Sequence, residues 1–319
     1  MEQLAPVVSA LRGFAGRVFL DIAYGSLPPV DGAFRRAVLW DDEGSTVARE
    51  VLVSGKPCLL ARLGSSELGC VSYYTRWRER RILPAPYPSQ LRRIMRVNAG
   101  VFPVDDASLD RFAEVFLGGV AQADVMGVWF NRNEDRIVER YCPEARLVQL
   151  EAFNCVLRTN PWSAELAGKI VLVVHPFAKT IQQQYQTRRA LLFANPEVLP
   201  EFELKTLAAV QSAAGGDSGH PSWFAALEDM TEQVAGIDFD VAIIGAGAYG
   251  LPLGAAVKAM GRQAVHLGAA TQLLFGVRGR RWEVESPHDI ARLFNEHWVR
   301  PSQDETPPDA QSVEGGCYW

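Results

Sequence analysis

The hydrophobic pattern alternates between short apolar runs and longer stretches with helical spacing. Six runs have strand length and are predicted to be strands, at residues 57–63, 123–129, 146–150, 169–174, 241–244 and 264–267. The run at 169–174 is apolar and β-branched without a break, which is typical of a strand buried on both faces. Because most intervening stretches can hold a helix, the pattern predicts an α/β fold, a Rossmann-like, doubly wound, mainly parallel sheet with helices on both faces.

Several of the stretches between the predicted strands have helical spacing of apolar residues or helix-capping residues, and are predicted to be helices. Helices are predicted at residues 106–119, 223–234, 251–260 and 290–298, with helical segments at 151–157 and 161–167, and a further short strand near 201–205. Asp105 or Asp106 is expected to cap the helix at 106–119. Residues 213–220 have the length and composition of a lid loop.

The two ends of the chain differ from its middle. Residues 4–24 show the spacing of an amphipathic helix, which packs on the domain or touches a membrane surface. Residues 1–54 are predicted to be an N-terminal helical segment. Residues 55–300 form the predicted Rossmann-like domain. Residues 301–319 form a linker and an aromatic tail, Cys317-Tyr318-Trp319, expected to be ordered on the body near the active cleft, on a second subunit or on a partner.

Composition limits the function. The 319 residues are 48% hydrophobic, enough for a large core, and the net charge of −5 argues against a general nucleic-acid binder. The five cysteines are scattered without a CxxC pair, so neither a disulfide framework nor a zinc site is indicated. No run reaches eighteen apolar residues, and we expect a soluble, cytoplasmic protein without a transmembrane segment, with homo-oligomerisation left open.

The stretch at residues 237–268 is a predicted strand, glycine turn, helix and strand. Gly245, Ala246 and Gly247 form the turn, where the backbone approaches a ligand and the next helix directs its N–H groups toward a phosphate. With Gly250, the glycines satisfy GxGxxG. The position where a dinucleotide site has an acid is occupied by His266, so an NAD site and glycines that only pack a helix remain alternatives.

A second group of polar residues follows the strand at 57–63. Arg62 is a fork-shaped cation, and Gly64 allows the backbone to turn. Ser65 and Ser66 are able to cap the next helix, and Glu67 lies in its first turn. Ligands of α/β sheets bind at such strand ends. The alternative is structural, with Ser65 as an N-cap and Glu67 interacting only with the helix dipole.

Further candidates follow two other strands. His175 and Lys179 come after the strand at 169–174, where a histidine binds phosphate, shuttles a proton or is only structural. Thr271 and Gln272 lie beyond the last strand. The arginines and aromatic residues of 71–103 suit base or sugar stacking, or a solvated helix face. Parallel strand ends share one edge, so one cleft is expected to contain Arg62, Glu67, His175, Lys179, Gly245, Gly247, His266 and Gln272.

Two of these segments carry a family resemblance. Arg62-Leu63-Gly64-Ser65-Ser66-Glu67-Leu68 resembles the Arg-x-Gly-Asp-Gly-Glu-Leu segment of the GT-D type glycosyltransferases, and residues 244–268 resemble their C-terminal glycine-turn unit. The similarity spans about residues 57–276. It implies a Rossmann-like domain, a nucleotide-sugar donor such as UDP-glucose, and an Asp-x-Glu motif associated with a divalent metal, with Glu67 and Arg62 at the matching positions.

Departures from the family motif qualify these expectations. Ser65 replaces the family aspartate, and serine is a poorer ligand for Mn²⁺ or Mg²⁺. Three alternatives follow: a weakened metal site at Glu67, a site completed by Glu151 or Asp135, or no metal requirement. His266 and the pair Ala269-Ala270 replace the Asp and His of the family's Asp-x-Gly-His pattern.

The resemblance implies transfer of a sugar to a surface polysaccharide or protein-linked glycan acceptor. In that reading Glu67 and His175 are catalytic, and the donor contacts Arg62, Gly64, Ser65, Lys179, Gly245, Ala246, Gly247, His266, Thr271 and Gln272. The alternatives are a non-catalytic nucleotide-sugar or polymer-assembly binding protein and an NAD(P)-dependent oxidoreductase.

Overall fold

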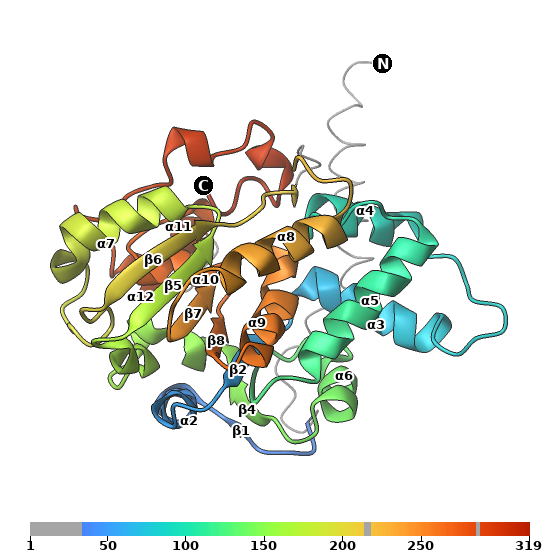
Figure 1. Cartoon of the computed structure of the whole chain (residues 1–319), viewed down its shortest axis with the longest axis horizontal. Helices are drawn as coiled ribbons and strands as arrows, with labels where there is room; N and C mark the ends of the chain where they lie inside the picture. Colours follow the sequence, from blue (N-terminus) through green and yellow to red (C-terminus); the bar gives the residue numbers. More distant parts are fainter. Residues whose placement is uncertain (1–33, 214–217, 285–287) are drawn as a thin grey trace.

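A single parallel sheet of eight strands organises the chain (Figure 1). The computed structural model describes residues 34–213, 218–284 and 288–319. The amphipathic stretch at 4–24 and residues 214–217 of the expected lid loop lie outside the described residues. The strand order is β1-β4-β3-β2-β8-β7-β5-β6, and every pairing is parallel. The predicted α/β fold with a parallel sheet is therefore confirmed.

The six strongest predicted strands all occur, with ends that differ by a few residues. The strands are β1 (Val38–Leu39), β2 (Cys58–Arg62), β3 (Val125–Val128), β4 (Arg146–Gln149), β5 (Ile170–His175), β6 (Glu203–Ala208), β7 (Val241–Ile244) and β8 (Gln263–His266). The short run near 201–205 corresponds to β6. The edge strand β1 was not predicted, because two residues are too short to show a period.

Each face of the sheet is covered by its own layer of helices (Figure 1). One layer contains α3 (Ser65–Trp77), α4 (Ser89–Val97), α5 (Asp106–Val120), α6 (Glu134–Tyr141), α8 (Trp223–Ala235) and α9 (Gly250–Ala259). The other contains α2 (Asp41–Val53), η2 (Leu150–Phe153), η3 (Cys155–Leu157), η4 (Trp162–Leu166), α7 (Ala178–Leu192), α10 (Ala270–Leu274), α11 (Arg280–Val284) and α12 (His288–Ala291). Within the described part of the chain, no helix combines the length and apolar character needed to cross a membrane.

Alternate residues of the central strands supply the two cores. In β2, Leu59 and Ala61 belong to the core under α3, α5 and α9, whereas Cys58 and Leu60 belong to the core on the other face. Side chains of a strand point alternately to its two faces, so a strand covered on both sides must be apolar throughout. This requirement explains the continuous apolar runs and restricts polar residues to the strand ends.

Two predicted segments differ in extent or type. The helix expected at 290–298 is only α12 followed by turns, because Trp298 is buried against Phe193 and Phe294, and Val299 bridges to Val277. The segments at 151–157 and 161–167 form 3-10 helices. At α5 the prediction is confirmed, since the Asp105 carboxylate accepts a hydrogen bond from the Ser108 N–H at 2.9 Å.

The first described residues belong to the same α/β unit as the rest. Strand β1 pairs with β4, with Val38 opposite Leu147. Val47 and Leu52 of α2 are buried in the core of the face opposite α3. Residues 38–53, which the sequence placed in an N-terminal helical segment, therefore extend the sheet and cover part of it.

Helix α9 packs closely on the sheet because two of its residues lack side chains. A Cβ atom at Gly250 would lie 2.2 Å from Cε1 of His266, and one at Gly254 would lie 2.7 Å from Cδ1 of Leu59. Both distances are far below van der Waals contact. The third glycine of the GxGxxG pattern therefore serves helix packing against an imidazole.

We predict opposite effects for two glycine-to-alanine substitutions. Gly250→Ala should lower the free energy of unfolding by about 1–3 kcal/mol, because the buried His266 ring must shift. Gly118→Ala is the control: this glycine is exposed in α5, and a Cβ there meets nothing within 4 Å, so the change should stabilise by roughly 0.5–1 kcal/mol. Urea unfolding measures both. Equal effects would contradict the packing role of Gly250.

Candidate functional site

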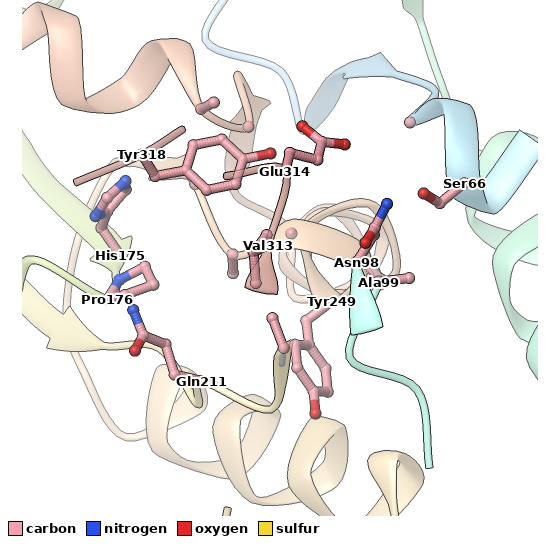
Figure 2. Close-up of a pocket in the computed structure, with 18 of the residues that line it drawn as sticks. Ser66, Asn98, Ala99, His175, Pro176, Gln211, Tyr249, Val313, Glu314 and Tyr318 are labelled. Atoms are coloured by element: carbon pink, nitrogen blue, oxygen red, sulfur yellow. The ribbon is translucent and has the colours of Figure 1, made fainter. Parts of the chain in front are cut away.

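A cleft of about 210 Å³ lies at the carboxyl ends of the central strands (Figure 2). Its walls come from the ends of β2 and β5, the turn between β7 and α9, the start of α3 and the C-terminal tail. Figure 2 shows His175 and Ser66 on opposite sides, with Tyr318 and Glu314 of the tail at one end and Tyr249 at the other. Parallel strands share this edge, which is why distant parts of the chain meet there.

Arg62, the last residue of β2, is the cation at the centre of this arrangement. No described residue accepts a hydrogen bond from its guanidinium or forms an ion pair with it. The guanidinium lies over the ring of Trp129, with 5.1 Å between Cζ and the ring centroid. Burial lowers the pKa of Arg62, while the charge of Glu67 acts in the opposite direction. Arginine stays protonated under such conditions, so the cleft contains a cation whose hydrogen-bond donors are available to an anion.

Glu67 lies in the first turn of α3 and folds back toward Gly64. A Cβ atom at Gly64 would lie 2.0 Å from Oε2 of Glu67, so only glycine leaves room for this carboxylate. Glu67 is 8% exposed. Burial raises the pKa of Glu67, opposed by its own backbone N–H and by Arg62. A buried carboxylate with a raised pKa is suited to accept a proton near neutral pH.

His175, the last residue of β5, is held as a neutral imidazole. Its Nδ1 accepts a hydrogen bond from the Phe177 N–H at 2.9 Å, so the neutral ring carries its proton on Nε2. Burial lowers the pKa of His175 to about 3. Gly245 makes the ring's position possible, since a Cβ there would lie 2.4 Å from Cδ2. His175 is therefore suited to donate a hydrogen bond rather than to carry a proton at neutral pH.

The glycine turn adopts the conformation that its sequence requires. Gly247 has φ of +52°, in the left-handed region that favours glycine. Gly245, Ala246 and Gly247 all line the cleft. The turn continues through a 3-10 segment, η6 (Gly247–Tyr249), directly into α9. The first two glycines thus face the cleft, in contrast to Gly250.

Other predicted residues divide into those on the wall and those behind it. Gly64, Ser65 and Gln272 line the cleft. His266 is 2% exposed and lies behind the wall, with burial lowering its pKa to about 3 and its Nδ1 3.3 Å from the Ile244 carbonyl oxygen. Thr271 is fully buried beside Gly245, and its hydroxyl has no hydrogen-bond partner among the described residues. His266 and Thr271 therefore do not reach a ligand in this cleft.

The expectation that Lys179 shares the cleft is wrong. Its side chain is 77% exposed and its Nζ pairs with Asp304 at 2.5 Å. Lys179 is the second residue of α7, and its backbone N–H donates to Glu305 at 2.8 Å. The segment after residue 300 thus covers the start of α7 and directs this lysine away from the cavity wall.

Glu134 is a buried carboxylate behind the wall. Its Oε2 accepts hydrogen bonds from the backbone N–H groups of Trp129 at 3.2 Å and Asn131 at 2.9 Å, while Oε1 has no partner among the described residues. Burial raises the pKa of Glu134 to about 8. The carboxylate holds the backbone that carries the Trp129 ring beside Arg62. The sequence marked residues 130–135 as a polar run after a strand, but not this role.

The aromatic tail is ordered and docks on the chain's own body. Cys317 is fully buried, and the Tyr318 carbonyl oxygen accepts a hydrogen bond from the Gln272 side-chain amide at 3.2 Å. The Trp319 Nε1 donates to the Glu305 carbonyl oxygen at 3.3 Å. Tyr318 lines the cleft, and its ring lies 4.9 Å from Cζ of Arg281. Of the three sites proposed for the tail, the structure places it on its own body beside the cleft.

Sequence patterns missed several residues of the cleft wall. Asn98 follows α4, Gln211 and Ser212 follow β6, and Tyr249 lies in the 3-10 turn. The Ser212 hydroxyl lies 2.8 Å from the Tyr249 hydroxyl. Their position after a strand was the sequence feature that could have identified Gln211 and Ser212 as cleft residues. No sequence feature identified Asn98, because it reaches the cleft through the packing of α4.

Glu134→Gln should change how stability depends on pH. The pKa of Glu134 is raised in the folded chain to about 8 from an ordinary 4.5, so its contribution is complete below pH 4.5 and is lost as pH rises through 8. Glutamine keeps the acceptor oxygen and does not titrate. The free energy of unfolding of the wild type should therefore fall relative to the variant between pH 5 and 8, by at most about 1.4 kcal/mol per pH unit.

Urea unfolding at pH 5, 6, 7 and 8 measures this difference. Asp135→Asn, which removes the adjacent carboxylate of α6, is the control. Its free energy of unfolding relative to the wild type should not show the pH dependence expected for Glu134→Gln. A constant difference between the wild type and Glu134→Gln over the whole range would show that Glu134 is ionised throughout.

Deleting residues 315–319 should lower the melting temperature, because the tail's hydrogen bonds and buried Cys317 are lost. Each kcal/mol lost corresponds to roughly 2 °C in a chain of this size. Trp319→Ala keeps the backbone contacts of the tail and should give a smaller decrease. Thermal unfolding followed by circular dichroism measures both. An unchanged melting temperature after the deletion would contradict the docking.

Comparison with known proteins adds no relative to this geometry. No family model matches the chain, and no match is found among the curated proteins or the solved structures. A parallel α/β sheet is used by proteins of many unrelated functions, so the fold by itself indicates none. A function for the cleft must be inferred from the chemistry of its walls.

Proposed function

We propose that the cleft binds a nucleoside diphosphate sugar and transfers the sugar to a hydroxyl group of a glycan acceptor. The observation that carries this proposal is Arg62, a cation without a hydrogen-bonded or ion-paired partner among the described residues, which lines the same cavity as the glycine turn at 245–247. An arginine fork and backbone N–H groups are the usual partners of phosphate. The resemblance of both segments to the GT-D type glycosyltransferases supports the same assignment.

The charges of the wall suit a leaving diphosphate. As the bond from the sugar C1 to the diphosphate oxygen breaks, the electron pair stays on that oxygen and negative charge develops there. Arg62 is in place to stabilise this charge, and Arg281, which lines the cleft while paired with Glu314, is a second cation near it. His175 adds a neutral hydrogen-bond donor. Such preorganised donors stabilise developing charge in a desolvated site.

Glu67 is the general base in this proposal. As the acceptor oxygen forms its bond to C1, the hydroxyl proton passes to the Glu67 carboxylate. Burial raises the pKa of this carboxylate, which brings its proton affinity closer to neutral pH. The alternative role of Glu67, that of a metal ligand, is less well supported by the residues around it.

The donor set of the cleft fits a divalent cation poorly. The carboxylates lining it are Glu67, whose charge interacts with Arg62, and Glu314, which is paired with Arg281. Ser65 contributes only a hydroxyl where the related family has an aspartate. Mg²⁺ and Mn²⁺ favour carboxylate oxygens, and no group of three or more His, Cys, Asp or Glu residues with metal-binding geometry occurs among the described residues. Both expectations, a transferase that uses Mn²⁺ or Mg²⁺ and one that is independent of metal, therefore stay open, and this donor set favours the second.

The first alternative, an NAD(P)-dependent oxidoreductase, lacks its ribose-binding group. The end of β8, where an acid would hold the ribose, is His266, and this residue is buried behind the wall. The second alternative, a non-catalytic nucleotide-sugar or polymer-assembly binding protein, uses the same Arg62 and the same turn. It differs from the transferase only in having no turnover.

The donor is tested by thermal shift with UDP, GDP, CDP and NAD(H), each with and without Mn²⁺. One nucleoside diphosphate should stabilise the wild type, and Arg62→Ala should weaken its affinity at least tenfold, because the diphosphate loses its main cation. Arg188→Ala, an exposed arginine of α7, is the control and should not change the affinity. Stabilisation by NAD(H) alone would overturn the proposal.

The chemical step is tested with the matching nucleotide sugar. Glu67→Gln should leave nucleotide affinity within about twofold, but reduce sugar transfer or donor hydrolysis by roughly 10²–10⁴-fold, the usual contribution of a general base. Release of the nucleoside diphosphate provides the assay. Tight nucleotide binding without turnover in the wild type, over a panel of sugars and acceptors, would support the binding protein instead.

A further inference from the structure

The loop between α3 and α4 presents apolar side chains to solvent at its tip. Ile82 is 99% exposed and Leu83 is 90% exposed, and Trp77 at the end of α3 is 45% exposed. Figure 1 shows this cyan loop projecting beyond the helical layer at the right of the molecule. Isolated apolar residues on a surface are ordinary, but two adjacent aliphatic side chains that are almost fully exposed, in the same loop region as an exposed tryptophan, form a group.

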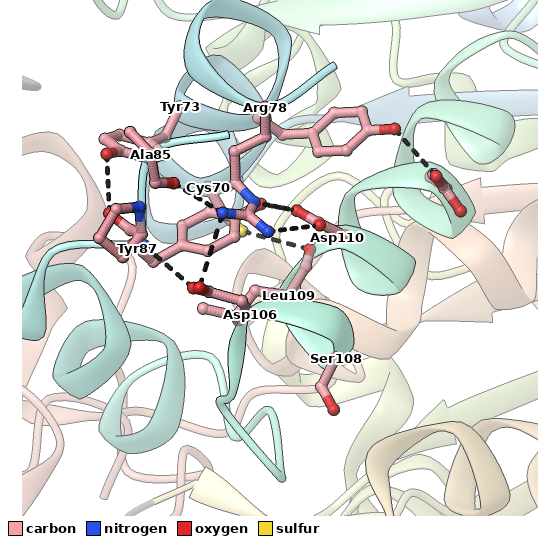
Figure 3. Close-up of polar contacts among 12 residues, drawn as sticks. Cys70, Tyr73, Arg78, Ala85, Tyr87, Asp106, Ser108, Leu109 and Asp110 are labelled. Atoms are coloured by element: carbon pink, nitrogen blue, oxygen red, sulfur yellow. Dashed lines mark hydrogen bonds and ion pairs between the residues drawn. The ribbon is translucent and has the colours of Figure 1, made fainter. Parts of the chain in front are cut away.

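The base of the loop is held firmly, which keeps the tip away from the body (Figure 3). Arg78, at the start of the loop, donates two hydrogen bonds to the Asp110 carboxylate, at 2.5 and 2.7 Å. It also donates to the Ala85 carbonyl oxygen at 2.6 Å, which joins the two ends of the loop. The Tyr73 hydroxyl donates to the Pro86 carbonyl oxygen at 2.9 Å. These hydrogen bonds fix both ends of the loop, and the residues at its tip, Ile82 and Leu83, remain exposed to solvent.

Exposed cations precede the apolar tip in the sequence. Arg76, Arg80 and Arg81 are exposed, in a chain whose net charge is −5. The one acid of the loop, Glu79, is paired with Arg140 at 2.9 Å. The guanidinium of Arg76 lies 4.9 Å from the centroid of the Trp77 ring. The tip thus combines aliphatic side chains with an aromatic residue and a local positive charge, opposite in sign to the whole chain.

A second cavity adjoins this surface, between α3 and α6. Its volume is about 380 Å³, and three arginines line it, Arg76, Arg136 and Arg140. Ser72 also lines it, and its hydroxyl has no hydrogen-bond partner among the described residues. Arg140 is already paired with Glu79, so Arg76 and Arg136 are the cations of this hollow whose guanidinium groups suit a phosphate. Because Arg76 belongs to both features, the cavity lies next to Trp77 and the loop.

We propose that this surface, formed by the loop at residues 78–87, Trp77 and the arginine-lined cavity, binds the chain peripherally to a bilayer containing anionic phospholipids. Ile82 and Leu83 insert among the acyl chains, Trp77 lies at the level of the headgroups, and the arginines pair with lipid phosphates. Apolar insertion combined with basic residues is how interfacial segments bind anionic membranes. The inference does not depend on the function proposed for the cleft.

The geometry separates the membrane surface from the cleft. Helix α3 begins at Ser65 on the cleft wall and ends at Trp77, so at 1.5 Å per residue the two sites lie roughly 18 Å apart along the helix. A bilayer at the loop tip would leave the cleft open and at a set height above the lipid headgroups.

Vesicle co-sedimentation of the full chain tests the proposal. The wild type should bind vesicles of phosphatidylcholine with 30% phosphatidylglycerol, and release should follow as NaCl rises from 50 to 500 mM, since salt screens the arginines. The double substitution Ile82→Ser with Leu83→Ser, and separately Arg80→Glu with Arg81→Glu, should each lower the partition coefficient at least tenfold. All variants are compared with the wild type by thermal unfolding to show that they fold.

Two matched controls remove the same chemistry elsewhere. Val53→Ser with Leu191→Ser removes two other exposed aliphatic side chains, 61% and 48% exposed, and Lys56→Glu with Arg188→Glu makes the same change in net charge. Both should bind within twofold of the wild type. Equal losses in the controls, or equal binding to vesicles of phosphatidylcholine alone, would overturn the proposal.

Insertion itself is measured with a fluorophore at the tip. All five native cysteines are buried, so Ile82→Cys can be labelled selectively with an environment-sensitive dye. The emission should shift to the blue with anionic vesicles and remain unchanged with soluble glycerol phosphate, which separates a lipid surface from a simple phosphate site. No shift with vesicles would overturn insertion. A shift that instead follows protein concentration without lipid, lost in Ile82→Ser with Leu83→Ser, would identify a second copy of the chain as the occupant and also overturn it.

Discussion

The parallel alignment of all eight strands is the constraint on which the rest of the structure depends. Each strand is paired in the same direction, and the strands β2, β3, β5 and β7 are buried between the two helical layers, so nearly every residue within these four is apolar. Polar side chains are left to the positions where strands end. Because all these ends lie at one edge, Arg62 from β2, His175 from β5 and Gly245 after β7 meet although they are distant along the chain.

Burial then determines the chemistry of the groups that meet. Removing a charge from water is costly unless a partner of opposite sign replaces the solvent. In the cleft, Arg62 and Glu67 influence each other's pKa, but no hydrogen bond or ion pair between described residues satisfies the guanidinium. An anionic ligand would provide that partner. The same desolvation keeps His175 neutral, which limits it to donating or accepting hydrogen bonds.

Helix α3 connects the two surfaces for which functions are proposed. Its first turn carries Glu67 in the cleft, and its last residue, Trp77, stands beside the exposed loop. The hydrogen bonds of Arg78 to Asp110 and Ala85 fix the end of this helix to α5 and to the far side of the loop. A helix held in this way is a rigid spacer, so the orientation of the loop on any surface also sets the orientation of the cleft.

The sequence by itself determined the sheet, the glycine turn and the meeting of Arg62, Glu67, His175 and Gly245 at one edge. These features depend on local patterns, since a continuous apolar run reports burial on both faces and a strand end has only one place in a parallel sheet.

Only the tertiary structure decided where individual side chains point. Lys179 was directed outward by Asp304, His266 was enclosed by α9, and the aromatic tail was laid beside the cleft. Glu134 became a buried carboxylate under Trp129. In each case the deciding contact comes from a segment far away in the chain or from the packing of a neighbouring helix, and no pattern within a short window of sequence contains that information.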